Sequence, residues 1–271
     1  MKTKYVLFLS MLFGAMLLIH VSCNNDKPDE NTTSGHISFT FTHLVDGMPL
    51  QKDAMKYVNA AGNPYEINQL MYFISDVTLY KSDGSKRLIS DWTDNHYVDI
   101  DIPSTLTWEV YDDIASGAYD SISFIFGFTA QKNKSFMFVN PPEVNMMWPD
   151  VLGGGYHYMM INGSWKNDAN IINSYAFHLG IGQLYKSNVI NVDSIYAFVQ
   201  NYFTVSLPGS AFKIESGKTR KIELIMNVDS WFKTPHAFDF NYWGGAIMQN
   251  QAAMQMAKEN GADVFKVGLI E

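Results

Sequence analysis

Apolar and polar residues alternate along most of this 271-residue chain, and this period of two constrains the fold more than any other feature. Successive side chains of a β-strand point to opposite faces of its sheet. Each alternating run therefore predicts a strand with one buried and one solvated face. Clear runs of this kind lie at residues 37–42, 98–102, 121–129 and 221–228.

Turn-forming dipeptides separate these runs, and they are Asp46-Gly47, Asp83-Gly84, Ser116-Gly117, Pro208-Gly209 and Ser216-Gly217. Residues 202–228 therefore read as two or three short strands around two turns. Helical periodicity is clearest at residues 246–260, and a last strand is expected at residues 264–270. Short strands without alternating helices predict an all-β fold, a mostly antiparallel β-sandwich with a short helix near the C-terminus.

The N-terminal segment has the features of a bacterial lipoprotein signal. Two lysines precede an apolar run at residues 5–21, which is marginal in length for a stable bilayer span. Cys23 is the only cysteine and follows the small residue Ser22, so acylation of its thiol explains both its position and its solitude. We expect residues 1–22 to be a signal peptide, Cys23 to be lipidated, and the protein to be an outer membrane lipoprotein facing the periplasm or the cell surface.

The segment after Cys23 contains no apolar residue, so residues 23–35 are expected to be a disordered tether and residues 36–271 a single β domain. Cleavage would remove two lysines and no acid, which leaves 19 − 2 = 17 basic against 27 acidic residues, a balance of 17 − 27 = −10. No continuous basic stripe offsets this charge. We therefore expect no nucleic-acid binding.

Several histidines are candidates for chemistry. His43 follows Phe39 and Phe41 at every second position, so it is expected to point into the core with them. His178 lies near Gly180, whose lack of a side chain leaves room for the imidazole. His157, which shares a face with Met159, is a third candidate, whereas His96 is expected in a solvated turn. A buried neutral imidazole either bonds to polar groups of the core or binds a metal, and the sequence leaves both readings open.

Fifteen methionines are many for this length, and Met146-Met147 and Met159-Met160 bring thioethers close together. Thioethers suit Cu(I), but methionine is also the usual adaptable core residue. Motifs of the common catalytic classes, namely the nucleophile elbow, the His-Glu-x-x-His helix and the phosphate-binding loop, do not occur in the sequence. Composition and motifs thus favour binding over catalysis.

Six segments, taken together and in order, resemble the MbnP-like family of exported proteins. They are residues 41–50, residues 68–79, Met146-Met147-Trp148 with Gly155-Tyr156, Asn162-Gly163, Phe177-His178-Leu179-Gly180, and residues 254–265. The resemblance covers roughly residues 36 to 270.

This resemblance implies a mononuclear copper site built by two histidines and a tryptophan that a partner di-haem, peroxidase-like enzyme oxidises to kynurenine. Carried over onto this chain, His43 and His178 match the family's histidine motifs and become the expected ligands. Trp148 is the expected modified tryptophan, with His157 and Met159 as further candidates for the site.

The sequence thus predicts an exported lipoprotein that binds copper, as Cu(I), for acquisition or delivery and is not an enzyme. One alternative is a metal-free surface lipoprotein that binds a glycan or another envelope protein through exposed aromatic residues. Trp92, Trp108, Trp231, Tyr242 and Trp243 are the candidates for that surface. Another alternative is an envelope enzyme that acts on glycans through carboxylates.

Overall fold

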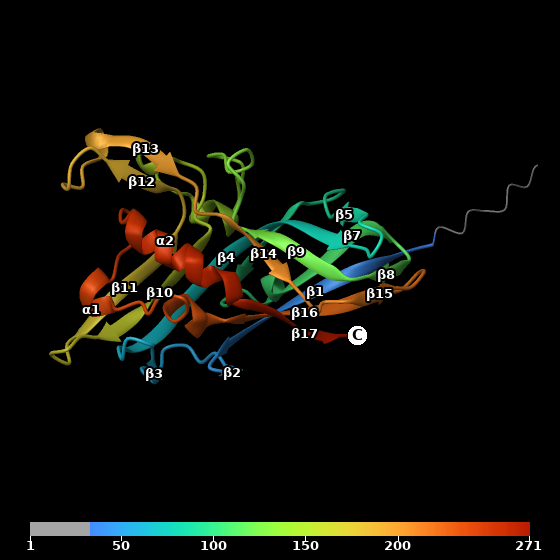
Figure 1. Cartoon of the computed structure of the whole chain (residues 1–271), viewed down its shortest axis with the longest axis horizontal. Coiled ribbons are helices and arrows are strands. Elements are labelled where there is room, and N and C mark those ends of the chain that lie inside the picture. The colour runs from blue at the N-terminus through green and yellow to red at the C-terminus, as the bar shows by residue number, and fades with distance from the viewer. Residues whose placement is uncertain (1–32) are drawn as a thin grey trace, which may run out of the picture. The chain divides into compact units, whose positions relative to one another are not determined.

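Two large β-sheets dominate the computed structural model, which describes residues 33–271. The expected signal peptide, Cys23 and the tether up to residue 32 lie outside the described residues. The sheets pack against each other through their apolar faces, which confirms the predicted all-β sandwich (Figure 1). None of the helices in residues 33–271 has the length and apolar character needed to cross a bilayer.

The first sheet is built around the N-terminal strand. Its strands are β17 (Phe265–Ile270), β16 (Thr219–Asn227), β1 (Ser34–Val45), β2 (Met48–Pro49) and β7 (Thr107–Ala115). All its pairs are antiparallel except β1 with β16, which are parallel. The domain begins two residues before the expected boundary because Ser34 and Gly35 already belong to β1.

The second sheet is built around one long strand, β4. Its strands are β11 (Ile172–Leu179), β10 (Met159–Lys166), β4 (Pro64–Tyr80), β9 (Ser121–Phe126) and β14 (Phe203–Leu207), and the short strands β3 (Tyr57–Val58), β5 (Lys86–Leu88) and β6 (Asn95–Asp99) also pair with β4. All these pairs are antiparallel.

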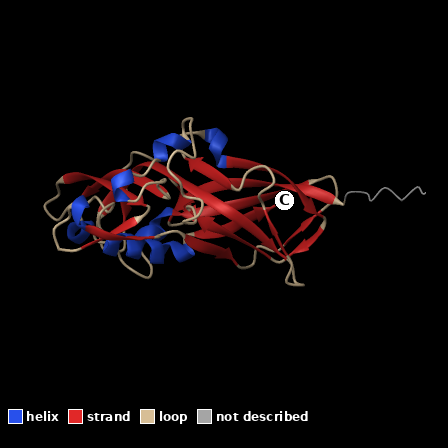
Figure 2. Cartoon of the chain, turned by 90° about the horizontal axis from the view of Figure 1, so that it is seen from above, coloured by secondary structure: helices blue, strands red, loops and turns tan. Residues whose placement is uncertain are grey.

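The remaining elements are short. Two small sheets pair β12 (Gly182–Tyr185) with β13 (Ile195–Val199) and β8 (Gly117–Tyr119) with β15 (Phe212–Ile214). The helices are α1 (Phe240–Trp243) and α2 (Gln251–Asn260), with 3-10 turns at Pro103–Leu106, Glu143–Met146, Asp150–Leu152, Val192–Ser194, Val228–Phe232 and Gly261–Asp263. Figure 2 shows most of the helical segments over one half of the described residues and mainly strands and loops in the other.

Helix α2 confirms the predicted short C-terminal helix but begins later than expected. The Asn250 side chain accepts a hydrogen bond from the backbone N–H of Ala253, 3.1 Å away, and so caps the helix. Ala246, expected to be helical, instead forms a β-bridge with Ala176 on β11. The segment before the cap therefore covers part of the edge of the second sheet.

Aromatic residues fill the space between the two large sheets. Tyr72 of β4 is completely buried, and its ring lies 6.5 Å from that of Phe41, 5.8 Å from that of Phe126 and 5.9 Å from that of Phe265. These rings come from β1, β9 and β17. Their contacts join strands that lie far apart in the chain, which is the main source of stability for a sandwich without disulfides.

His96 is not in a solvated turn as expected. Its ring is stacked between Phe41 and Trp108, with centroids 5.2 Å from each, and its Nε2–H donates to the Thr105 carbonyl oxygen 2.8 Å away. Burial lowers the pKa of His96 to about 4. The imidazole therefore acts as a neutral aromatic residue of the core.

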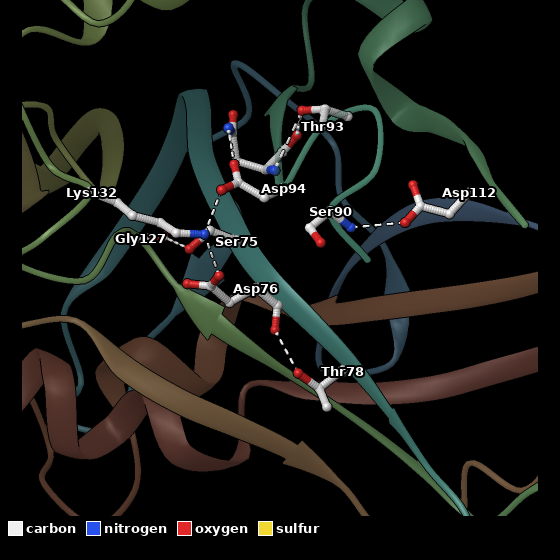
Figure 3. Close-up of polar contacts among 10 residues, drawn as sticks. Ser75, Asp76, Thr78, Ser90, Thr93, Asp94, Asp112, Gly127 and Lys132 are labelled. Atoms are coloured by element: carbon white, nitrogen blue, oxygen red, sulfur yellow. Dashed lines mark hydrogen bonds and ion pairs between the residues drawn. The ribbon is translucent and has the colours of Figure 1, made fainter. Parts of the chain in front are cut away.

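A lysine fixes the start of the long loop that follows β9 (Figure 3). The Lys132 ammonium bridges Asp76, where β4 is irregular, and Asp94, which precedes β6. The next residue, Asn133, accepts a 2.8 Å hydrogen bond from the Tyr156 backbone N–H. The start of the loop that carries Trp148 and His157 is thus tied to β4, and its end is tied to that start.

Candidate metal centre

His43 occupies the core position that the parity of β1 predicts. Its side chain is 8% exposed, and Nε2 lies 3.1 Å from the Tyr72 hydroxyl oxygen. Burial lowers the pKa of His43 to about 4 and raises that of Tyr72 well above its ordinary value, so a neutral imidazole and a neutral phenol share this hydrogen bond. Nε2 of His43 is therefore engaged inside the core.

His178 lies on the other face of the second sheet. Directly opposed residues of paired strands point to the same face, and the register places Met71, Met160 and His178 in one row. The adjacent row contains Tyr72, Met159 and Leu179, so it faces the opposite way. His43 contacts Tyr72, which lies on the face opposite His178. The structure therefore does not bring His43 and His178 together as the expected pair of ligands.

The structure brings His178 together with His157 and Trp148 instead. The rings of His157 and His178 are 5.1 Å apart and nearly perpendicular, at 84°. Trp148 packs against His157, and the centroids of the two rings are 4.6 Å apart. His157 lies two residues before the first residue of β10, and its backbone N–H donates to the Met146 carbonyl oxygen 2.7 Å away, which fixes the position of the ring beside β11.

Hydrogen bonds set the tautomer of both imidazoles. The side-chain oxygen of Asn162 is 2.8 Å from Nε2 of His178, and the carbonyl oxygen of Met146 is 2.9 Å from Nδ1 of His157. These oxygens accept, so both ring nitrogens carry protons. The other two nitrogens, Nδ1 of His178 and Nε2 of His157, are buried without a hydrogen-bond partner. Each presents an unused lone pair.

Burial keeps these two rings neutral. Desolvation lowers the pKa of His157 to about 4, and desolvation together with the neighbouring His157 lowers that of His178 to about 3. Neutral imidazoles with one nitrogen donating to a fixed oxygen are the state in which histidine binds a metal. The donor set of this cluster therefore fits a soft or borderline metal ion.

Trp148 packs against this cluster and against Gly180. It is completely buried, and its indole N–H donates to the Leu152 carbonyl oxygen 3.1 Å away. The six-membered ring lies directly on Gly180, where an added Cβ would be 2.6 Å from ring atoms. The glycine two residues after His178 thus allows the tryptophan to reach the histidine pair.

Met159 belongs to the opposite face, where it is completely buried. Met160 is the methionine that stands beside His178 in the cross-strand row, and it is partly exposed. Within the described part of the chain, no group of three or more His, Cys, Asp or Glu side chains could hold a metal ion. A metal here would rely on the two imidazoles and on weaker donors.

The aromatic residues proposed for a binding surface divide into two groups. Trp108 and Trp231 are core residues, 4% and 0% exposed. Trp92 and Tyr242 are 74% and 77% exposed and Trp243 is half-buried, so these three remain candidates for surface contacts.

Comparison with known proteins supplies the family. A family model described as MbnP matches residues 34–251. The chain belongs to the MbnP family. The matched region begins with β1, ends at the first residue of α2 and contains Trp148, His157 and His178. This confirms the resemblance seen in the sequence, and MbnP membership associates the chain with copper-related proteins of the methanobactin system.

Among solved structures, MbnP from Methylosinus trichosporium matches this chain with 15% sequence identity and a TM-score of 0.49. The match covers 87% of this chain and 98% of that chain. A comparison with curated proteins finds no match.

Proposed function

We propose that this MbnP family member is a non-catalytic lipoprotein that binds copper, as Cu(I), for acquisition or delivery. One observation carries the proposal: two buried, neutral imidazoles lie 5.1 Å apart, and each has one nitrogen fixed by an acceptor and one without a partner. An orphaned buried lone pair costs free energy unless a ligand uses it. Two such lone pairs on adjacent rings support a shared ion.

Nε2 of His157 and Nδ1 of His178 would hold the ion. Bonds from imidazole nitrogen to a metal are about 2.0–2.1 Å long, which suits rings at this separation. Met160 stands directly opposite His178 in the register, and a thioether donor there would favour Cu(I) over harder divalent ions. The buried Trp148 ring would shield one side of the ion from water, and the low coordination would leave the ion open to transfer.

Trp148 is also proposed as the residue that a di-haem, peroxidase-like partner oxidises to kynurenine. Its contact with His157 supports this proposal, because a modified ring would lie beside the proposed ligands. Peptide mass spectrometry of protein purified from its native host tests this point, because conversion to kynurenine changes the mass of the Trp148 peptide by a fixed amount. An unmodified peptide from cells that contain the partner enzyme would exclude the modification.

The proposed location follows from the N-terminal sequence. Acylation of Cys23 would hold the domain at the outer membrane, facing the periplasm or the cell surface. Metabolic labelling with a lipid precursor tests it, and Cys23→Ser is expected to abolish the label.

The copper site is tested by titrating residues 33–271 with Cu(I) against a coloured competing chelator. The matched variants are His157→Gln, His178→Gln and His43→Gln, since glutamine keeps hydrogen-bonding capacity but removes the imidazole. Wild type is expected to bind about one Cu(I) ion per chain, and each of the first two variants to lose at least about tenfold in affinity. His43→Gln is expected to bind as wild type does.

The three variants separate the possible ligand sets. Loss in His43→Gln and His178→Gln with normal binding in His157→Gln would restore the pair expected from the sequence. Equal binding by all three folded variants would reject a histidine copper site. Circular dichroism of each variant establishes that it is folded.

A further inference from the structure

One strand of the small β12–β13 sheet has a free edge. β13 pairs with β12 along one side, and within residues 33–271 no other strand pairs with it. The Ile195 backbone N–H donates to the Val192 carbonyl oxygen, and the backbone groups of Tyr196–Val199 make no hydrogen bond outside that pair among the described backbone contacts. Figure 1 shows β13 as the outermost strand at its end of the domain.

The edge has no charged residue and no proline, and its one irregularity is a register shift against β12 at Tyr196. Edge strands are commonly protected by charged residues, proline or bulging. β7, at an edge of the first sheet, carries Glu109, Asp112 and Asp113, and β17 carries Lys266. β13 reads Ile-Tyr-Ala-Phe-Val, and Tyr196 and Phe198 are 59% and 50% exposed.

The sequence of β13 is nearly the same in both directions about Ala197. Two β-branched residues are outermost, two aromatic residues lie inside them, and the small alanine is central. An antiparallel pair of identical strands has a two-fold axis and sets residue i opposite residue j of the partner and j opposite i. We propose that β13 pairs in this way with β13 of a second copy of this chain, with the axis at Ala197.

This register makes the two strands complementary to each other. Tyr196 of each copy would face Phe198 of the other on one side of the new sheet, and Ile195 would face Val199 on the opposite side. Aromatic and β-branched cross-strand pairs stabilise antiparallel strands more than alanine pairs do. The backbone groups at the edge would gain hydrogen bonds, as in other complexes formed by strand addition.

Charges beside the strand agree with the same register. Pairing about Ala197 sets Gln200 of one copy opposite Ser194 of the other, next to Asp193. The Lys258 ammonium lies 3.2 Å from the Gln200 carbonyl oxygen. Neither Asp193 nor Lys258 forms an ion pair within the described residues. The dimer would bring these opposite charges close together at both ends of the strand pair.

A five-residue strand pair is smaller than a standard stable interface, which buries about 1,600 Å². The dimer is therefore expected to be weak in solution and to form at high local concentration. Attachment of both copies to one membrane would supply that concentration. This inference rests on β13 and does not depend on copper.

Sedimentation analysis of residues 33–271 over micromolar to millimolar concentrations tests the dimer. The average mass of wild type is expected to rise toward twice that of one chain. Ala197→Lys and Ala197→Glu each set like charges opposite each other across the axis, so each alone is expected to weaken association by about tenfold or more. An equimolar mixture of the two is expected to recover association.

Ala118→Lys is the matched control, because Ala118 is an exposed alanine on the edge strand β8. It is expected to associate as wild type does. A single-chain mass for wild type at all concentrations would overturn the proposal. So would association that is unchanged in Ala197→Lys, or a mixture of the two charge variants that fails to associate.

Discussion

Gly180→Ala is expected to destabilise the domain through a single added methyl group. The backbone of Gly180 has an ordinary conformation, and a Cβ built there would lie 2.6 Å from two atoms of the Trp148 ring. Trp148 is completely buried, so the ring cannot move into solvent. Inserting a methylene-sized group into a packed core costs about 1–3 kcal/mol.

The assay is urea and thermal unfolding followed by circular dichroism. For a domain of this size each kcal/mol lowers the midpoint temperature by about 2–4 °C, so a fall of roughly 2–12 °C is expected. Because Trp148 contacts His157, the same variant is expected to weaken Cu(I) binding.

A double-mutant cycle with Trp148→Phe separates the clash from other effects. Phenylalanine removes the ring atoms nearest Gly180, and the Leu152 carbonyl oxygen keeps its 2.8 Å hydrogen bond from the Gln183 side chain. Trp148→Phe alone leaves a cavity and lowers stability. The double variant is expected to be more stable than the sum of the two losses by about 1 kcal/mol or more. Additive losses, or a Gly180→Ala protein as stable as wild type, would refute the packing argument.

Two further predictions concern buried ionisable groups. His43 has a folded pKa of about 4, below its ordinary value of 6.5, so the unfolded chain takes the proton first and stability is lost as pH falls from 6.5 toward 4. At 1.36 kcal/mol per pKa unit, this histidine accounts for about 3 kcal/mol of the free energy of unfolding that is lost over that pH range. In His43→Gln, the loss measured by urea unfolding over the same range should be smaller by that amount. Asp112 is 1% exposed and accepts hydrogen bonds from Arg87 and from the backbone N–H groups of Ser90 and Asp91. Asp112→Ala should therefore lower the free energy of unfolding in urea by about 3 kcal/mol. The control Asp113→Ala, at an exposed position, should lower it by under about 0.5 kcal/mol. An unchanged pH profile would contradict the first prediction, and equal losses at the two aspartates the second.

Most of the fold was predictable because its signals are local. Alternation along β1, β9 and β16 identified strands and buried faces, and the turn dipeptides marked where the chain reverses. The inward direction of His43 followed from the same parity. These features depend only on residues within the same strand.

The errors in the predicted site come from contacts between distant strands. Parity gives the face of a residue relative to its own strand, but it does not say which strands are neighbours or in what register they pair. His43 and His178 are both buried, yet the register of β4, β10 and β11 sets them on opposite faces. The same register places Met160 beside His178, in place of the expected Met159. The solvated turn predicted for His96 is wrong because its stacking partners, Phe41 and Trp108, come from two other strands.

Burial alone does not distinguish a ligand histidine from a structural one in this protein. His43, His157 and His178 are all less than a tenth exposed and all have a lowered pKa. The difference lies in the hydrogen bonds that the ring nitrogens of each histidine make. Nε2 of His43 is hydrogen-bonded to the Tyr72 phenol, whereas His157 and His178 donate through one nitrogen and leave the other without a partner on adjacent rings. Asn162 and the Met146 carbonyl, which set those tautomers, are therefore as necessary to the proposed copper site as the histidines themselves.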